Sequence, residues 1–264
     1  LVLGNNTALT QLTCYGNQLT SLDVSANTSL TTLSCYNNPL NNLDVTSNTA
    51  LTTLNCYNNE LTNLDVSYNT SLTYMRCDAN SLTSLDISNN TALTGLECYG
   101  NSLTTLDVSN NTTLTHLKCQ SNQLTSLDVS NNTALIDLRC FDNQLTYLNM
   151  RNGVTEALTT FIATNNPDLT CIETLDPDYA TTNWTNDGGN IDEGVIFSFI
   201  CGSEDQDVWH VATTGSDGGA GTQESPFATI QTGINAAGDG NTVQVAAGTY
   251  VENISYSGRN ITVM

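Results

Sequence analysis

Apolar residues recur at a fixed spacing of 21 positions along the first two thirds of the chain. From Leu9 to Ala134 each unit reads L-x-x-L-x-C-x-x-N-x-L-x-x-L-D-V-S-x-N-T-x, with small variations such as Met75 for a leucine and Ile87 for a valine. A fixed period of this length predicts a solenoid, in which every unit is one coil that buries its apolar side against the next coil.

The first half of each unit predicts a short β-strand. In "LTTLSC", residues 30–35, apolar and polar positions alternate toward the end, as they do in a strand with one face on a core, and Asn38 then turns the chain. Because every coil repeats this pattern, we expect the strands to stack in parallel, with the leucine and cysteine side chains pointing inward.

The unit resembles the leucine-rich repeat, L-x-x-L-x-L-x-x-N-x-L, with cysteine in place of the third leucine. More closely it resembles the 21-residue, cysteine-containing repeat of bacterial internalin-type surface proteins. The resemblance covers residues 1–169 in about eight coils, of which the first is incomplete and the last, from Leu158, carries Phe161 and Ala163 at the core positions. It implies a β-rich leucine-rich repeat solenoid with a binding function. It also implies that the repeated asparagine hydrogen-bonds the backbone of its turn and of the next coil.

Cysteine follows the same period. Equivalent positions on stacked strands lie about 4.8 Å apart with parallel Cα–Cβ bonds, whereas a disulfide needs Cβ atoms about 3.8 Å apart that converge. We therefore expect a ladder of buried free thiols that pack as small apolar groups. No C-x-x-C pair or adjacent histidine points to a metal site, and inward-facing thiols are unsuited to catalysis. The ladder consists of Cys14, Cys35, Cys56, Cys77, Cys98, Cys119 and Cys140.

Two further cysteines, Cys171 and Cys201, ignore the period. Nine cysteines cannot all pair within one chain, so the economical assignment is one disulfide between these two. Closing a loop of about 30 residues contributes roughly 3 to 4 kcal/mol in the chain-entropy description and places the protein outside a reducing cytosol. Residues 170–203, which contain Trp184 and a Pro-Asp turn, resemble the carboxy-terminal cap of secreted bacterial leucine-rich repeat proteins. The expected location is therefore secreted or cell-surface.

Residues 204–264 follow an acidic hinge at 202–207 and have a different pattern. Ser225 and Pro226 predict the start of a short helix whose apolar face contains Phe227, Ile230 and Ile234. "TVQVAAGTY", "ENISY" and "NITV" then read as strands. The segment resembles the amino-terminal helix and first coil of pectin-lyase-like right-handed parallel β-helices, which implies a fold but little about activity.

The chain carries 26 acidic and 5 basic residues, giving a net charge of −21. Such a charge repels nucleic acid and anionic lipid surfaces, and no apolar run approaches the roughly 18 residues of a membrane span. Leu1 begins in the middle of a coil, and residues 241–264 form one coil without a successor. We therefore expect a longer parent protein, with self-association through open solenoid ends as the alternative.

The clearest candidate binding surface is the outward face of the strands, which is expected to be concave. Three of the five basic residues share one column there, beside a column of aromatic residues. Stacking and charge-assisted hydrogen bonds would suit a glycan or an acidic protein. The alternative is that Glu97 only neutralises Arg76 and Lys118, and that the aromatic column only stiffens the sheet. The candidate residues are Tyr15, Tyr36, Tyr57, Tyr74, Arg76, Glu97, Tyr99, His116, Lys118, Asp137, Arg139 and Phe141.

A column of aspartates is the only candidate metal site. Like charges about 5 Å apart in water cost only about 0.8 kcal/mol per pair, so calcium could bridge them, or each Asp could simply cap the following turn. No other cofactor is expected. The column consists of Asp23, Asp44, Asp65, Asp86, Asp107 and Asp128.

The sequence therefore favours a non-catalytic recognition or adhesion module that binds a protein or glycan, since no nucleophile and base or paired carboxylate site can be assembled. The first alternative is an accessory region of a polysaccharide-active β-helix enzyme with catalytic coils beyond residue 264. The second is a structural stalk or filament built by end-to-end stacking of solenoids.

Overall fold

The computed structural model describes residues 1–4, 6–202, 206–256 and 258–264. The chain divides into two compact units, Leu1–Phe197 and Ser198–Met264. Half of the predicted acidic hinge, residues 203–205, and with it the predicted boundary between residues 203 and 204, lie outside the described residues.

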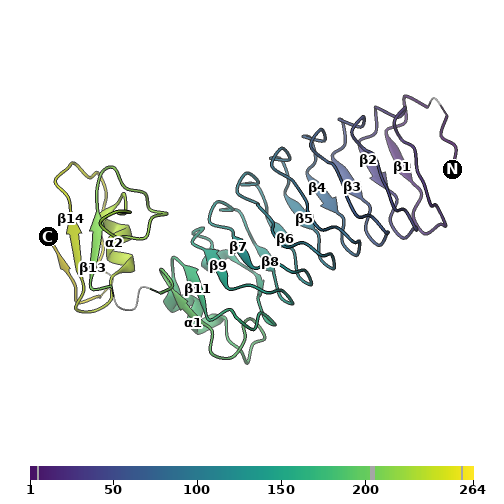
Figure 1. Ribbon diagram of the computed structural model, residues 1–264. Helices are drawn as coiled ribbons and strands as arrows, with labels where there is room; N and C mark the ends of the chain where they lie inside the picture. The colour runs from purple at the N-terminus through teal and green to yellow at the C-terminus, as the bar shows by residue number, and fades with distance from the viewer. Residues whose placement is uncertain (5, 203–205, 257) are drawn as a thin grey trace. The chain divides into compact units, whose positions relative to one another are not determined.

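The first unit is a solenoid in which each coil contributes one short strand to a parallel sheet (Figure 1). Its eight-stranded sheet has the order β1-β2-β3-β4-β5-β6-β8-β10. Equivalent residues pair directly, as in Leu12 with Leu33 and Leu33 with Leu54. The predicted leucine-rich repeat solenoid is therefore confirmed. The strands are β1 (Gln11–Thr13), β2 (Thr32–Ser34), β3 (Thr53–Asn55), β4 (Tyr74–Arg76), β5 (Gly95–Glu97), β6 (His116–Lys118), β8 (Asp137–Arg139) and β10 (Thr160–Ile162).

A second sheet forms where the repeats end. It has the order β12-β11-β9-β7, with β7 at Ser126–Asp128, β9 at Tyr147–Met150, β11 at Cys171–Thr174 and β12 at Ile196–Ser198. A 3-10 helix, η1 (Thr155–Ala157), and the helix α1 (Pro177–Asn183) complete this region. Asp176 caps α1 by accepting a hydrogen bond from the Tyr179 N–H at 2.9 Å. Trp184 follows the helix and packs on Phe161 and Phe197, with ring centroids 4.5 and 5.7 Å away, so aromatic side chains continue the leucine core.

Leucine and cysteine side chains fill the solenoid core. Leu33, Cys35 and Leu40 have no exposed surface, whereas Cys14 in the first coil is 8% exposed. All seven cysteines of the ladder are free and buried. Burial raises the pKa of the Cys35 thiol to about 12, so the thiol stays protonated at neutral pH. Cys171 and Cys201 are each disulfide-bonded.

The repeated asparagine holds neighbouring coils together. The Asn38 amide donates to the Cys35 carbonyl at 3.0 Å and to the Cys14 carbonyl at 3.1 Å, and its Oδ1 accepts from the Leu19 N–H at 3.0 Å. The coil that it reaches is the preceding one, not the next one as the resemblance implied. The reason is that the turn of each coil presents its free carbonyl and N–H groups toward the following asparagine.

A second asparagine column, which the sequence analysis did not single out, lies deeper in the core. Asn48 is fully buried and donates to the Asn27 carbonyl at 2.9 Å and to the Val24 carbonyl at 3.0 Å. Such amides satisfy backbone carbonyls that no regular ladder reaches. The same pattern recurs at Asn69, Asn90, Asn111 and Asn132.

The residue just before each turn asparagine adopts a left-handed backbone conformation. Glycine fills this position in two coils, but Ala79 (φ 50°) and Ser121 (φ 55°) carry a Cβ atom there. A residue with a Cβ in this region costs roughly 1 to 2 kcal/mol. The column consists of Gly16, Asn37, Asn58, Ala79, Gly100, Ser121, Asp142 and Asn165.

The second unit contains a three-stranded parallel sheet and one helix. The order is β13-β14-β15, with β13 at Val208–Val211, β14 at Thr242–Val245 and β15 at Thr262–Val263. The helix α2 (Ile230–Ala236) contacts β13 and β14. The core of this unit contains Trp209, Phe227 and Ile234.

Two local predictions for this unit are wrong. The helix begins at Ile230 with Thr229 as its N-cap, not at Pro226 after Ser225. Phe227 instead bridges Val211: its N–H donates to the His210 carbonyl and its own carbonyl accepts from the Ala212 N–H, both at 2.9 Å. These backbone bonds hold Phe227 in a β-bridge instead of a helical turn.

The segment "ENISY", residues 252–256, forms no strand. The Glu252 carboxylate accepts hydrogen bonds from the N–H groups of Ile230 and Gln231, both at 2.8 Å. The position of this segment in the fold is therefore determined by the free N–H groups at the start of α2 rather than by sheet pairing.

Replacing Ala79 by glycine should stabilise the first unit by about 0.5 to 1 kcal/mol, because the relief of left-handed strain exceeds the entropy lost by glycine. The measurement is the free energy of unfolding by urea. Ala134→Gly is the matched control. Ala134 lacks a positive φ, so this substitution should lower the free energy of unfolding. Equal effects at both positions would contradict the strain argument.

Thiol titration of the denatured, unreduced chain should detect the seven free cysteines. In the native chain Cys14 should react first, because it is the most exposed thiol of the ladder, and the other six should react only on unfolding. A denatured count far below seven would show that the ladder is crosslinked.

Candidate functional site

The strand register brings the predicted site residues together on the outward face of the eight-stranded sheet, which we call the sheet face. Arg76, Glu97, Lys118 and Arg139 are direct neighbours on β4, β5, β6 and β8. The charged column predicted from the sequence is therefore continuous across these four strands.

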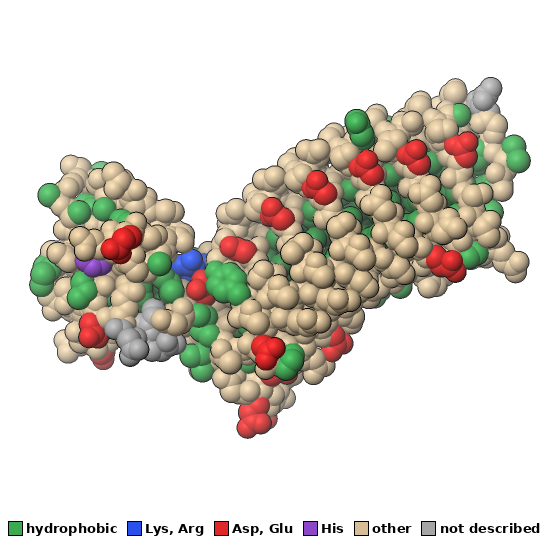
Figure 2. Space-filling model, viewed as in Figure 1, with side chains coloured by type: hydrophobic (Ala, Val, Ile, Leu, Met, Phe, Trp, Pro, Cys, Tyr) green, Lys and Arg blue, Asp and Glu red, His purple; other side chains and the backbone are tan. Residues whose placement is uncertain are grey.

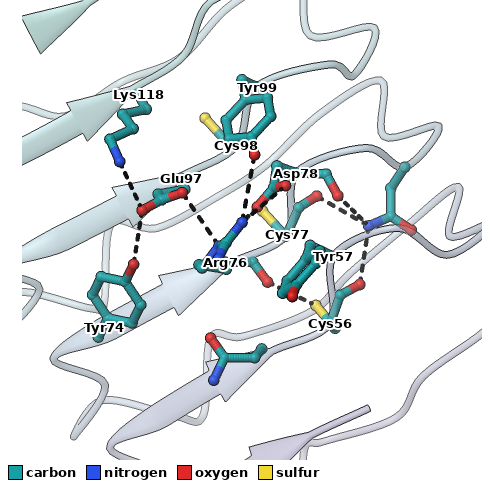
Figure 3. A network of polar contacts seen from close by, with 12 residues as sticks. Cys56, Tyr57, Tyr74, Arg76, Cys77, Asp78, Glu97, Cys98, Tyr99 and Lys118 are labelled. Atoms are coloured by element: carbon teal, nitrogen blue, oxygen red, sulfur yellow. Dashed lines mark hydrogen bonds and ion pairs between the residues drawn. The ribbon is translucent and has the colours of Figure 1, made fainter. Parts of the chain in front are cut away.

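Glu97 is the centre of a polar network (Figure 3). Its Oε1 accepts hydrogen bonds from the Tyr74 hydroxyl at 2.8 Å and from Lys118 Nζ at 3.0 Å, and its Oε2 lies 3.2 Å from Arg76 Nε. Only 8% of Glu97 is exposed. A buried carboxylate is stable only when its oxygens are paired in this way.

Arg76 is held on several sides. Its Nε lies 3.2 Å from Asp78 Oδ1, its Nη2 donates to the Tyr99 hydroxyl at 3.4 Å, and its Cζ lies 4.0 Å above the ring of Tyr57. Asp78 is itself only 2% exposed. The guanidinium group is therefore fixed by two carboxylates and a cation–π contact before any ligand binds.

The environment changes the pKa of the central groups. Burial alone would raise the pKa of Glu97, but the Tyr74 hydroxyl, Lys118 and Arg76 together outweigh it and lower that pKa. Burial and the hydrogen bond to Glu97 raise the pKa of Tyr74 to about 12. Glu97 is consequently charged and Tyr74 neutral over the whole physiological pH range.

The remaining charges of the sheet face are paired as well. Arg139 Nε lies 2.9 Å from Asp137 Oδ1, and a second hydrogen bond of 3.2 Å joins Nη2 to Oδ2. With Arg76, Lys118, Asp78 and Glu97, this pair gives three cations and three carboxylates. The predicted basic column thus has no net charge within the network.

The aromatic column begins with three stacked tyrosines. The ring centroids of Tyr15 and Tyr36 are 4.3 Å apart at 7°, and those of Tyr36 and Tyr57 are 4.3 Å apart at 10°. Arg76 covers the far side of Tyr57. Both ring faces of Tyr36 and Tyr57 are therefore covered, whereas Tyr15, which is 47% exposed, stacks on Tyr36 with one face.

The last predicted residues lie on the same face. His116 on β6 is exposed, and its Nδ1 lies 2.9 Å from the Thr115 hydroxyl. Phe141 follows β8 and is half-buried.

Gly95 is a site residue that the sequence analysis missed. It occupies the same strand position as Tyr74 and His116, and a Cβ atom there would lie 2.6 Å from Cδ2 of the Tyr74 ring. The missing side chain lets Tyr74 lie over β5 and reach Glu97. The available signal was a glycine in a column that otherwise carries larger residues.

The aspartate column lies outside the sheet face and caps turns. Asp23 Oδ1 accepts from the Ser25 N–H at 3.0 Å and from its hydroxyl at 2.6 Å, and these bonds lower the pKa of Asp23. The backbone bond recurs at Asp44, Asp65, Asp86, Asp107 and Asp128. Figure 2 shows a regular row of acidic side chains along the repeats. Within the described residues no group of three or more His, Cys, Asp or Glu side chains is placed to hold a metal ion.

Solved structures similar to the chain are leucine-rich repeat proteins. The functional domain of InlJ from Listeria monocytogenes, which includes a cysteine ladder, is 36% identical with a TM-score of 0.52, over 66% of this chain and 45% of that chain. A leucine-rich repeat protein from Leptospira interrogans is 26% identical with a TM-score of 0.52, over 64% of this chain and 43% of that chain. Internalin C2 from Listeria monocytogenes, 24% identical with a TM-score of 0.52 over 60% and 71% of the two chains, shares the fold.

This chain thus spans less than half the length of the first two structures. A family described as a protein of unknown function (DUF1565) matches residues 213–256, and no curated protein matches the chain. None of the helices in the described ranges is long and apolar enough to cross a membrane.

Replacing Glu97 by glutamine should destabilise the first unit by about 2 to 4 kcal/mol at pH 7, because Arg76 and Lys118 lose their shared partner in a largely buried network. The lowered pKa of Glu97 means that its contribution is present above the unfolded value of about 4.3 and is lost as the pH falls through the folded value. The stability difference from the wild type should therefore shrink below about pH 4.

Urea denaturation at pH 7 and pH 3.5 measures this difference. Glu60→Gln is the matched control, because Glu60 is an exposed acid of the repeats without an ion pair among the described residues. A Glu97→Gln deficit that does not change with pH would contradict the ion-pair account.

Proposed function

We propose that the chain is a non-catalytic recognition or adhesion module that binds a ligand, a protein or a glycan, on the sheet face of its repeats. The observation that carries the proposal is the fixed network of Arg76, Glu97 and Lys118 beside the tyrosine stack. These side chains are ordered before binding, so a ligand would not have to immobilise them.

A protein ligand fits this surface better than a glycan does. A sugar ring that stacks on an aromatic residue needs an open ring face, but Tyr36 and Tyr57 are covered on both faces, which leaves one face of Tyr15 in this stack. The tyrosine edges and hydroxyl groups suit the mixed polar and apolar contacts of a protein interface.

The balanced charges of the sheet face also argue against a strongly acidic ligand. Arg76, Lys118 and Arg139 already have carboxylate partners, and the whole chain has a net charge of −21. Long-range attraction of an anionic partner is therefore weak, and direct shape and hydrogen-bond complementarity would determine affinity.

We further propose a secreted or cell-surface location on a bacterium. The disulfide-bonded state of Cys171 and Cys201 supports an oxidising compartment, and similarity to listerial InlJ supports a bacterial source. The proposed domains are the repeats at 1–169, the cap at 170–203 and the start of a pectin-lyase-like β-helix at 204–264. The parallel order β13-β14-β15 supports the last assignment.

Photo-crosslinking tests the ligand-binding proposal. The full chain carrying p-benzoylphenylalanine at His116, which is exposed on the sheet face, is incubated with intact mammalian and bacterial cells. The same probe at Tyr68, 61% exposed and outside the eight strands, is the matched control. We expect a discrete crosslinked protein from position 116 only, which disappears when the cells are first treated with protease.

Equal crosslinking from both positions, or none from position 116, would contradict the proposal. Loss after periodate oxidation of cell-surface sugars, with resistance to protease, would identify a glycan ligand instead. Release of soluble sugars from polysaccharide by the purified chain would favour the enzymatic alternative, and concentration-dependent growth in mass would favour end-to-end self-association.

A further inference from the structure

The region that follows the repeats contains a cavity that is separate from the sheet face. Its volume is about 480 Å³, within the usual range of 300 to 1,000 Å³ for small-molecule sites. It is lined by the end of α1, the loop that follows and β12, all between residues 181 and 197.

The walls of this cavity are mainly apolar and aromatic. Trp184 and Phe197 pack against each other with centroids 5.7 Å apart, and Ile191 is also buried. Ile196, which lines the same cavity, is 50% exposed. An exposed β-branched residue beside buried aromatic rings offers apolar contact area to a bound molecule.

The charged lining is acidic. Asp192 and Glu193 both line the cavity, and no lysine, arginine or histidine is among the described residues that line it. Glu193 is exposed and makes no ion pair with any residue that the structure describes. A cation in this cavity would therefore find a carboxylate without an ion-pair partner next to the apolar wall formed by Ile196.

Hydrogen bonds between side chains and the backbone hold the cavity wall in place. The Asp192 carboxylate accepts from the N–H groups of Asn165 and Asn166, both at 2.9 Å, which ties the wall to the last coil. The Asn186 amide donates to the Ile191 carbonyl at 3.2 Å. The cavity is thus formed by an ordered loop and needs no closure around a ligand.

We infer that this cavity binds a small organic cation with an apolar body, such as an arylalkylammonium ion. The apolar body packs on Ile196 and the aromatic walls, and the ammonium group lies beside Glu193. This site goes beyond the proposed ligand on the sheet face, and neither proposal depends on the other.

Nuclear magnetic resonance of the full chain tests the inference with two probes of similar shape and opposite charge. The chain has two tryptophans, so it gives two indole N–H signals, which Trp209→Phe assigns. We expect 2-phenylethylammonium to shift the Trp184 signal saturably and to leave the Trp209 signal unchanged. 3-Phenylpropionate should bind at least roughly tenfold more weakly, because the cavity lining carries only negative charge.

Two substitutions at exposed positions separate the apolar and charge contributions. Ile196→Ser should weaken binding of the ammonium probe roughly tenfold through lost apolar contact, and Glu193→Gln roughly threefold through loss of an exposed charge. Tyr68→Ser and Glu156→Gln are the matched controls, since both residues are exposed in the same unit and lie outside the cavity. Circular dichroism verifies that each variant is folded.

The inference is overturned if neither probe shifts the Trp184 signal at millimolar concentration, or if both probes bind equally well. Unchanged affinity in folded Ile196→Ser and Glu193→Gln would also overturn it, because the probe would then bind elsewhere. None of these results bears on crosslinking from His116, so the two proposals can fail separately.

Discussion

The constant rise of one coil upon the next is the constraint on which the rest of the first unit depends. Parallel strands in register place equivalent side chains about 4.8 Å apart with the same direction. Every repeated residue therefore becomes a column, and each column must be stable as a stack of identical groups. Leucine and cysteine meet this condition by packing, which is why seven adjacent thiols remain free and buried.

Polar columns meet the same condition in different ways. The amide of Asn38 has both donor and acceptor atoms and can bond its own turn and the preceding coil at once. Asp23 has only acceptors, so it bonds the N–H of its own turn and faces water. A column of one charge cannot be buried. The buried part of the sheet face therefore alternates in sign from Arg76 to Glu97 to Lys118.

Departures from the repeat thus locate the places where the molecule is specialised. Gly95 makes room for Tyr74, and Asp78 interrupts the tyrosine column at the point where Arg76 needs a carboxylate. The end of the repeats is another departure, because aromatic residues replace leucines and leave an acidic cavity near Trp184. Both binding sites that we propose lie where neighbouring coils stop being identical.

The sequence by itself determined the solenoid, its parallel register and the columns on each face, because contacts between coils recur at a fixed offset of 21 residues and are visible as a period. Contacts without a period were decided by the tertiary structure. Glu252 binds the start of α2, and Asp192 binds the turn at Asn165, through pairings that no repeat announces. The sequence also placed the tyrosines and the charged residues on one face. It did not determine which rings stack or which charges pair. Ring stacking and ion pairing depend on side-chain directions, which are determined by packing against neighbouring strands rather than by position in the repeat.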